Sequence, residues 1–182
     1  MIAPAKGTLL IANPFLKDPN FVRSVIFICE HTDHGSFGFV LNKNHTQTLN
    51  ELLPDLEQSY PVFVGGPVQM DSLHFLHQYP DLIPGGEEVL DGIYWGGNFE
   101  SLRIHLNSGN IEEDKIRFFV GYSGWTEGQL DDELKTDSWL TVMGTRKIIF
   151  KTPAVNTWKD SLKLLGGDYE MMINYPLDPQ LN

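Results

Sequence analysis

Cys29 and His31 are the pair of side chains best suited to covalent chemistry, because a thiolate is a nucleophile and an imidazole can serve as its base. They lie two positions apart on a predicted strand and therefore point to the same face. Two positions along a strand span about 6.5 Å, which exceeds a hydrogen bond unless the side chains lean together. Cysteine is also among the residue types most often buried. The sequence thus favours a core cysteine beside a structural histidine over a nucleophile pair.

Metal and phosphate sites have weaker support. His74 and His77 would point to opposite faces of a strand, so they do not form a ligand pair. A single cysteine excludes an internal disulfide and any zinc site built on several thiolates. Residues 65–67 (Gly-Gly-Pro) follow a predicted strand but no Lys-Ser or Lys-Thr comes after them, so we expect these glycines to serve a turn. We predict no metal and no cofactor.

The most distinctive local motif is the segment 121–130. Thr126 suits a helix N-cap, and Gln129 stands three residues later, where its side chain can return a bond to the cap. Trp125 and Leu130 have the spacing of a hydrophobic staple. An anion site at this helix start is the functional alternative. The four carboxylates that follow by residue 133 would repel an anion, so the motif favours a structural helix start.

The charge balance argues against nucleic acid as a direct partner. The chain has 182 residues and a formal net charge of −11, and both halves are acidic. Nucleic-acid affinity depends on Lys and Arg, which neutralise phosphates. Arg146, Lys147 and Lys151 are the best candidates for a local basic patch, although a solvated strand edge protected by charge explains them more simply.

Composition and the N-terminal residues indicate a globular protein of the cytoplasm. The 41% hydrophobic and 12% aromatic content fits a packed core. No signal peptide is visible, and no apolar run approaches the roughly 20 residues that span a bilayer. A lone thiol fits a reducing compartment. We expect a cytoplasmic protein that does not enter the membrane.

Hydrophobic periodicity predicts strands linked by short turns, with helices interspersed singly. In residues 24–31, Val25, Phe27 and Cys29 face one side, while Ile26 and Ile28 face the other, which is typical of a central strand. The other predicted strands are 8–12, 37–41, 62–64, 73–77, 93–95, 116–122, 139–142 and 147–150. Four helices are predicted: a short one after Thr48, one after Asn98 (inner face Phe99, Leu102 and Leu106), one from Thr126, and one from Pro153 (face Val155, Trp158, Leu162 and Leu165).

This order does not follow a regular strand–helix–strand succession. It predicts an α+β fold with a mixed, mostly antiparallel sheet and helices packed around it. No repeat or linker interrupts the chain, so residues 1–182 are expected to form a single domain.

Taken together, several segments resemble the YqgE/AlgH family of bacterial proteins. They are residues 7–12, 18–21, 23–25, 29–31, 35–42, 63–68, 124–125 with 128–130, and Trp158 ahead of 164–166. They follow the family's order and span nearly the whole chain. The sequence departs from the family after Asn42, where it reads Lys43-Asn44-His45.

The resemblance implies an α+β fold on a bifurcated, partly barrel-like sheet surrounded by helices. Members of the family are often labelled transcriptional regulators, and no activity or catalytic residue comes with that label. Our first hypothesis is therefore a regulatory or adaptor protein that contacts another protein. The alternative is a small-molecule-binding protein or an enzyme of unfamiliar type, in which Arg23, His31, Asn42 and Gln129 converge near the sheet ends.

Overall fold

The computed structural model describes residues 1–177, and its centre is a nine-stranded sheet. The strands follow the chain as β1 (Thr8–Ala12), β2 (Val25–Thr32), β3 (Gly35–Val40), β4 (Val62–Val64), β5 (Val68–His77), β6 (Glu87–Leu90), β7 (Ile93–Trp95), β8 (Ile116–Thr126) and β9 (Trp139–Met143). The helices are α1 (Leu49–Leu52), α2 (Phe99–Asn107), α3 (Gln129–Lys135) and α4 (Ala154–Leu165). A π-helical turn (Lys147–Lys151) and 3₁₀ turns (Glu113–Lys115 and Gly167–Asn174) complete the described chain.

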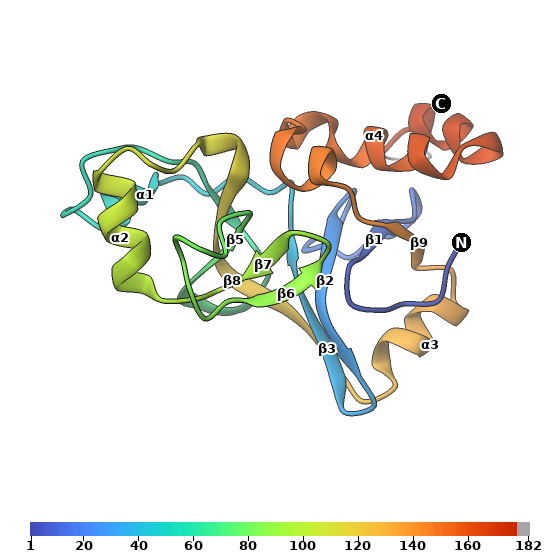
Figure 1. Cartoon of the computed structure of the whole chain (residues 1–182). Coiled ribbons are helices and arrows are strands. Elements are labelled where there is room, and N and C mark those ends of the chain that lie inside the picture. Colours follow the sequence, from blue (N-terminus) through green and yellow to red (C-terminus); the bar gives the residue numbers. More distant parts are fainter. Residues whose placement is uncertain (178–182) are drawn as a thin grey trace.

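The sheet is mixed and mostly antiparallel, as the sequence predicts. Its strand order is β6-β7-β5-β8-β3-β2-β1-β9, and β4 pairs with β8 in parallel. The long strand β8 is shared: its first half pairs with β4 and β5, and its second half pairs with β3. This sharing splits the sheet and lets it curl strongly into a half-barrel, which confirms the partly barrel-like expectation (Figure 1).

The split in the sheet depends on two glycines where backbones approach closely. A Cβ atom on Gly65 would lie 2.5 Å from the carbonyl oxygen of Gly121, and one on Gly66 would lie 2.2 Å from the carbonyl of Tyr122. Gly66 also has a φ of 156°, which side chains rarely adopt. Gly66 therefore serves the predicted turn, whereas Gly65 makes room for β8.

Three apolar clusters fix the curl. The inner face of the half-barrel holds the largest cluster, which includes Phe27 and Phe119. Helices α1 and α2 cover the outer face around β4, β5 and β8 (Figure 1), where Leu102 and Leu106 are buried. Helix α3 lies over the outer face of β1–β3 through Leu130. Because Phe27 belongs to the inner cluster and Ile26 and Ile28 to an outer one, the predicted two-sided burial of β2 is confirmed.

One end of the half-barrel is closed by α4 and the π-helical turn. Trp158 of α4 is buried and donates its indole N–H to the carbonyl oxygen of Ala12 at 2.8 Å. The strand predicted over 147–150 is wrong, because these residues form the π-helical turn. Ile148, Ile149 and Phe150 are all buried in the inner cluster, and a short apolar run buried on every side fits a helical turn as well as a strand.

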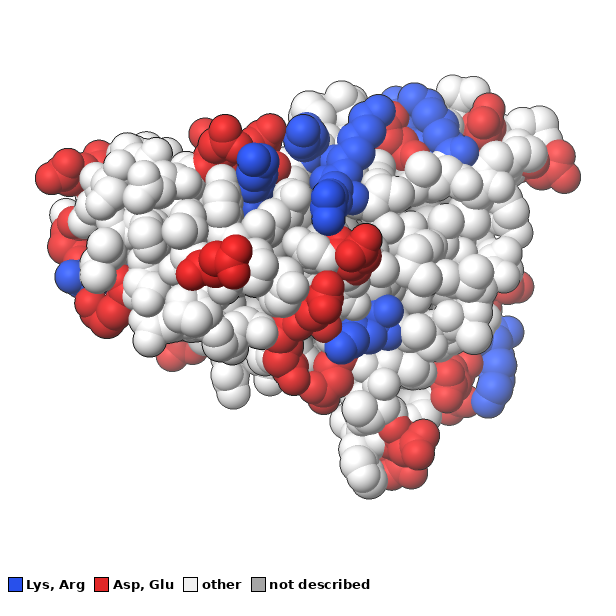
Figure 2. Space-filling model, in the orientation of Figure 1, with Lys and Arg blue, Asp and Glu red and all other residues white. Residues whose placement is uncertain are grey.

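Two of the basic residues at this turn, Arg146 and Lys151, contact oxygen atoms of acidic residues. Arg146 donates to the carbonyl oxygen of Asp91 at 3.1 Å, and Lys151 lies 3.5 Å from the Asp114 carboxylate. Figure 2 shows basic side chains along the edge where α4 and this turn lie, with acidic side chains between them. The prediction that these basic residues protect the edge of a strand is therefore also wrong, because no strand forms over residues 147–150.

Two predicted helix faces and one helix start differ from the structure. Phe99 and Val155 are 37% and 83% exposed, so neither belongs to the inner face of its helix. The helix predicted from Thr126 begins at Gln129, because β8 continues to Thr126 in its pairing with Gly35. The predicted hydrogen bond from the Gln129 side chain back to Thr126 is confirmed: the Thr126 N–H donates to Gln129 Oε1 at 3.0 Å.

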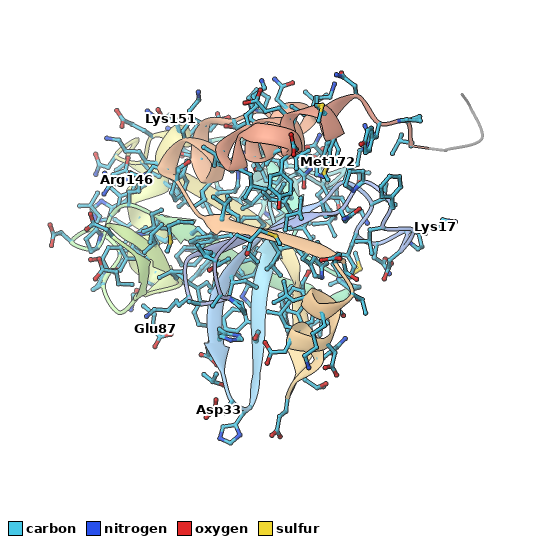
Figure 3. The ribbon with its side chains drawn as sticks, turned by 90° about the vertical axis from the view of Figure 1, so that its right-hand side faces the viewer. Lys17, Asp33, Glu87, Arg146, Lys151 and Met172 are labelled. Carbon is cyan, nitrogen blue, oxygen red and sulfur yellow. The ribbon has the colours of Figure 1, made fainter. Side chains whose placement is uncertain are left out.

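The opposite end of the half-barrel carries the β2–β3 hairpin. Figure 3 shows Asp33 at its tip, with Glu87 of β6 on the same side of the molecule and α4 across the far end. The polar pocket described below lies at this end, between the hairpin and the start of α3.

Candidate functional site

The four polar residues expected to converge lie in two groups at opposite ends of β2. Arg23 and Asn42 are next to its beginning, whereas His31 and Gln129 are near its end. Strand β2, which is eight residues long and spans roughly 26 Å, lies between the two groups. The structure therefore does not bring the four together around one cavity.

Arg23 and Asn42 hold the entry to β2. The Asn42 side-chain amide donates to the Arg23 carbonyl oxygen at 2.9 Å, and its oxygen accepts from the Val25 N–H at 3.0 Å. The Arg23 guanidinium lies 4.6 Å from the centre of the Trp158 ring and donates to the Tyr175 carbonyl oxygen. These contacts fasten the chain after α4 to the sheet, which is a structural role.

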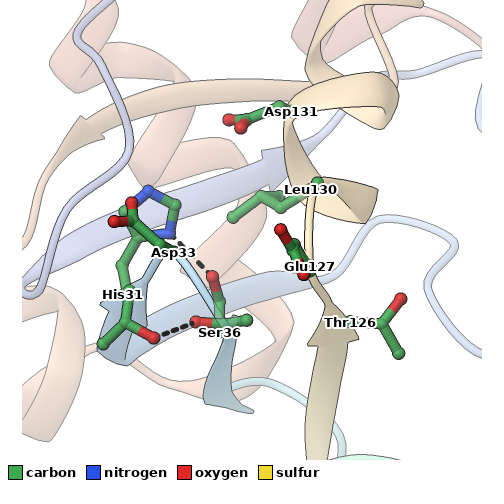
Figure 4. Close-up of a pocket in the computed structure, with 10 residues that line it drawn as sticks. His31, Asp33, Ser36, Thr126, Glu127, Leu130 and Asp131 are labelled. Atoms are coloured by element: carbon green, nitrogen blue, oxygen red, sulfur yellow. Dashed lines mark hydrogen bonds between the residues drawn. The ribbon is translucent and has the colours of Figure 1, made fainter.

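His31 lines a polar pocket of about 480 Å³ between the β2–β3 hairpin and the start of α3. Its Nδ1 lies 2.7 Å from the Ser36 hydroxyl oxygen (Figure 4). Asp33, Glu127 and Asp131 also line this pocket. A histidine beside a hydroxyl can move a proton, but the three carboxylates would repel an anionic ligand and favour a neutral or cationic one.

Gln129 is occupied by structural contacts. Its Oε1 accepts from the Thr126 N–H, and its Nε2 donates to Glu133 Oε1 at 3.2 Å. The side chain thus supports the turn between β8 and α3, as the motif around Thr126 indicates. Gln129 is absent from the lining of the polar pocket, although Gly128 and Leu130 on either side of it belong to that lining.

Cys29 and His31 have different surroundings, and the core interpretation of Cys29 is confirmed. Cys29 is 3% exposed in the inner cluster, and its thiol lies 3.7 Å from the Phe27 carbonyl oxygen. Burial raises the pKa of this thiol well above its usual value, which disfavours the thiolate. The pairing of β2 with β3 also shifts between Ile28 and Glu30, so Cys29 sits at an irregularity of the strand.

His74 and His77 face opposite sides of β5, as the sequence predicts. His77 is fully buried; its Nε2 lies 2.8 Å from the Gly96 carbonyl oxygen, and its Nδ1 accepts from the Tyr79 N–H. Burial lowers its pKa, which keeps the ring neutral. Within residues 1–177, no group of three or more His, Cys, Asp or Glu residues is placed to hold a metal ion.

The aromatic pocket, formed by Phe37, His74, Trp95 and Tyr122, is a hollow of about 350 Å³. Phe37 lies 4.7 Å from Trp95 and 6.2 Å from Tyr122, measured between ring centres. His74 lies 6.4 Å from Trp95 and 6.0 Å from Tyr122. The four rings thus form a closed circuit, and all of them are only half-buried.

This pocket lies where the inside of the half-barrel opens toward solvent. Phe37, Trp95 and Tyr122 pack against the inner cluster. The His74 ring is tilted against that of Phe39, a fully buried member of the cluster, with ring centres 5.3 Å apart. Mouths of barrel-like sheets are common ligand sites, because they are concave and built on rigid strands. The arrangement can hold an apolar or cationic group, since four aromatic rings line it.

Acidic side chains lie beside the aromatic pocket. Glu87 pairs with Trp95 across β6 and β7, so both side chains project from the same face of the sheet. Glu88 and Asp91 are exposed on the same hairpin. Figure 2 shows acidic side chains gathered over this hairpin.

Sequence reasoning missed the aromatic pocket. Its members come from four strands, β3, β5, β7 and β8, that are distant in the chain. Only their aromatic type and their places on predicted strands were visible in the sequence. Which of them share a face depends on how the sheet curls, and no local pattern encodes that curl.

Comparison with known proteins places the chain in a family. The AlgH-like family model matches residues 9–170, which is most of the chain. The chain belongs to the AlgH-like family. The resemblance drawn from the sequence motifs is therefore confirmed, and the matched range includes every residue of the aromatic and polar pockets.

This AlgH-like protein has relatives of nearly equal length. A UPF0301 protein from Cytophaga hutchinsonii is 44% identical over 179 residues, which cover 97% of this chain and 98% of that protein. A UPF0301 protein from Parabacteroides distasonis is 42% identical over 184 residues, covering 100% of this chain and 93% of that protein. Their names state no activity.

Solved structures share the fold. The solution structure of the AlgH protein from Pseudomonas aeruginosa has a TM-score of 0.75 at 28% identity, covering 97% of this chain and 98% of that one. A crystal structure from Corynebacterium diphtheriae has a TM-score of 0.80 at 20% identity and covers 96% of this chain and 94% of that one, which shows likeness of fold alone. Across residues 1–177, every helix is too short or too polar to cross a bilayer.

Proposed function

We propose that this AlgH-like protein is a cytoplasmic regulatory or adaptor protein that acts by contacting another protein through the aromatic pocket. Residues 1–182 act as a single domain in this proposal. The observation that supports it is the open circuit of four rings at the mouth of the half-barrel. Aromatic side chains are enriched in the cores of protein interfaces, where they contribute much of the binding energy.

Binding suits this pocket better than catalysis does. Its walls are the rings of Phe37, His74, Trp95 and Tyr122, and they include neither a carboxylate nor a thiol. The partner should carry positive charge, because the chain has a net charge of −11 and Glu87, which pairs with Trp95, is exposed beside the pocket. Complementary charge steers encounter and selects partners. The regulatory role follows from the label that many members of the family carry.

The test compares three forms of the full chain on an affinity support. Wild type, Trp95→Ala and the control Val155→Ala are exposed to the native cytoplasmic extract; Val155 is an exposed apolar residue of α4, away from the pocket. A partner captured by wild type and by Val155→Ala, but lost with Trp95→Ala, is then purified and its affinity measured directly. Circular dichroism establishes that both variants fold. The proposal is wrong if every reproducible partner binds Trp95→Ala as well as it binds wild type.

The second candidate function is small-molecule binding or an unfamiliar reaction in the polar pocket. It is favoured by the 2.7 Å contact between His31 and Ser36 inside a hollow of about 480 Å³. A screen of neutral and cationic metabolites by ligand-observed NMR tests it, with Ser36→Ala as the comparison. Ligands whose signals respond equally to wild type and Ser36→Ala would count against this candidate.

A further inference from the structure

We infer that the aromatic pocket holds a quaternary ammonium group, presented by the protein partner as a trimethylated lysine side chain. This inference rests on the proposed function and adds the chemistry of the recognised group. Four observations carry it: the ring circuit, its rigid support, the charge around it, and the polar groups that its walls lack.

The ring circuit has the form of a cage with a floor. Neighbouring ring centres around it are separated by 4.7, 6.4, 6.0 and 6.2 Å. Phe39 lies beneath, 5.3 Å from His74 and 6.1 Å from Phe37. A cation held within about 6 Å of several ring faces is attracted by each ring quadrupole.

The cage is held open by the sheet itself. Phe37 pairs across β3 and β8 with Gly124, which has no side chain. The Tyr122 ring lies over Gly124, where a Cβ atom would be at an ordinary contact distance of 3.5 Å from a ring carbon, and its centre is 6.2 Å from that of Phe37. The floor is rigid as well, because Phe39 stacks on Phe119 with ring centres 4.8 Å apart. A preformed cage loses little conformational entropy on binding.

The charge around the cage favours a cation. Burial lowers the pKa of His74, so its ring is neutral near pH 7 and does not repel a positive ligand. Glu87, directly across from Trp95, projects from the same face of the sheet and is exposed. It can contribute long-range attraction without entering the lining of the cage.

The cage should bind a quaternary ammonium group more tightly than the primary ammonium of an unmodified lysine, because its walls offer few hydrogen-bond acceptors. A primary ammonium has three N–H donors and loses free energy when they are buried without acceptors. The cage lining includes no carboxylate, and the Nε2 of His74 already lies 3.0 Å from the Ser72 hydroxyl oxygen. A trimethylammonium group has no N–H to satisfy, and its methyl groups pack against ring faces.

The experiment titrates the full chain with three capped peptides that differ in one side chain: trimethyllysine, its neutral carbon analogue with a tert-butyl terminus, and unmodified lysine. The readout is the indole N–H resonance of Trp95 in ¹H–¹⁵N spectra, which the Trp95→Phe variant assigns. We expect the trimethyllysine peptide to shift that resonance and to bind at least about fivefold more tightly than either comparison peptide. Tyr122→Ala, which removes a wall of the cage and keeps the Trp95 reporter, should abolish this binding, whereas Val155→Ala should leave it unchanged.

Each alternative outcome has a distinct meaning. Equal affinity for the carbon analogue would overturn the cation assignment and leave partner binding at the pocket intact. Lysine binding as tightly as trimethyllysine would overturn the requirement for methylation. Free choline binding as tightly as the trimethyllysine peptide would assign the cage to a small molecule. If no probe shifts the Trp95 resonance, the inference is wrong, whereas the proposed function fails separately, when partner capture is independent of Trp95.

Discussion

One oxygen of the Glu133 carboxylate accepts the indole N–H of Trp139 at 2.7 Å. The same oxygen accepts the indole N–H of Trp125 at 2.9 Å. Glu133 belongs to α3, Trp125 to β8 and Trp139 to β9, so one carboxylate ties the helix to two strands. The two rings also meet edge to face, with centres 6.4 Å apart. The outer face of β1–β3 is thereby closed by a charged group together with apolar packing.

Replacing Glu133 with alanine should therefore destabilise the protein by about 2–3 kcal/mol, because two largely buried indole donors lose a charged acceptor. Chemical unfolding followed by tryptophan fluorescence measures the change. Asp131→Ala is the matched control on the same helix: its side chain is exposed, and removal of an acidic residue from the first turn should cost less than about 1 kcal/mol. Equal losses in the two variants would show that the double acceptor has no special importance.

Asn42 should be important for stability rather than for ligand binding. Its side chain bonds the backbone of both Arg23 and Val25, so Asn42→Ala leaves an N–H and a carbonyl without these partners. We expect a loss of about 1–3 kcal/mol in the free energy of unfolding. Asn156→Ala, at an exposed site on α4, should change it by less than about 0.5 kcal/mol. A normal melting temperature for Asn42→Ala would contradict this role.

The sequence predicted elements well where local pattern decides them. Apolar residues on both faces identified β2 as a central strand, and Asn98 caps α2 by accepting from the Ser101 N–H. The short helix predicted after Thr48 forms as α1, and the Thr48 N–H donates to the Glu51 carboxylate at its start. The start of α3 shows the limit. The bond between Thr126 and Gln129 is local and was predictable, whereas the pairing of Thr126 with Gly35 comes from a distant strand and delays the helix.

The candidate sites were less predictable because they depend on curvature. Four polar residues were expected to meet: Arg23, His31, Asn42 and Gln129. The length of β2 keeps Arg23 and Asn42, at its beginning, away from His31 and Gln129, near its end. The rings of Phe37 and Trp95 lie 4.7 Å apart, although 58 residues separate them in the chain (95 − 37). Such contacts require the strand order and the curl of the whole sheet, which single-sequence periodicity does not contain.

His74 gives the protein a predictable response to acid. Burial lowers its pKa below the value of about 6.5 expected in the unfolded chain, so the unfolded state binds the proton more readily. This contribution to stability is fully present above pH 6.5 and is lost as the pH falls toward the lowered pKa. His77, whose pKa is also lowered, contributes in the same direction.

His74→Phe keeps an aromatic wall and removes one titration, so stability should fall less steeply between pH 7 and pH 5 than in wild type. Part of the dependence of stability on pH should remain in this variant, because His77 still titrates with a lowered pKa. Val155→Ala, at an exposed site on α4, removes no titratable group and should retain the full wild-type slope. Urea unfolding at several pH values provides the comparison, and an unchanged slope in His74→Phe would mean that His74 titrates normally in the folded protein.

Because protonated His74 would also repel a cation in the cage, binding of the trimethyllysine peptide to wild type should weaken between pH 7 and pH 5, whereas His74→Phe should bind it independently of pH.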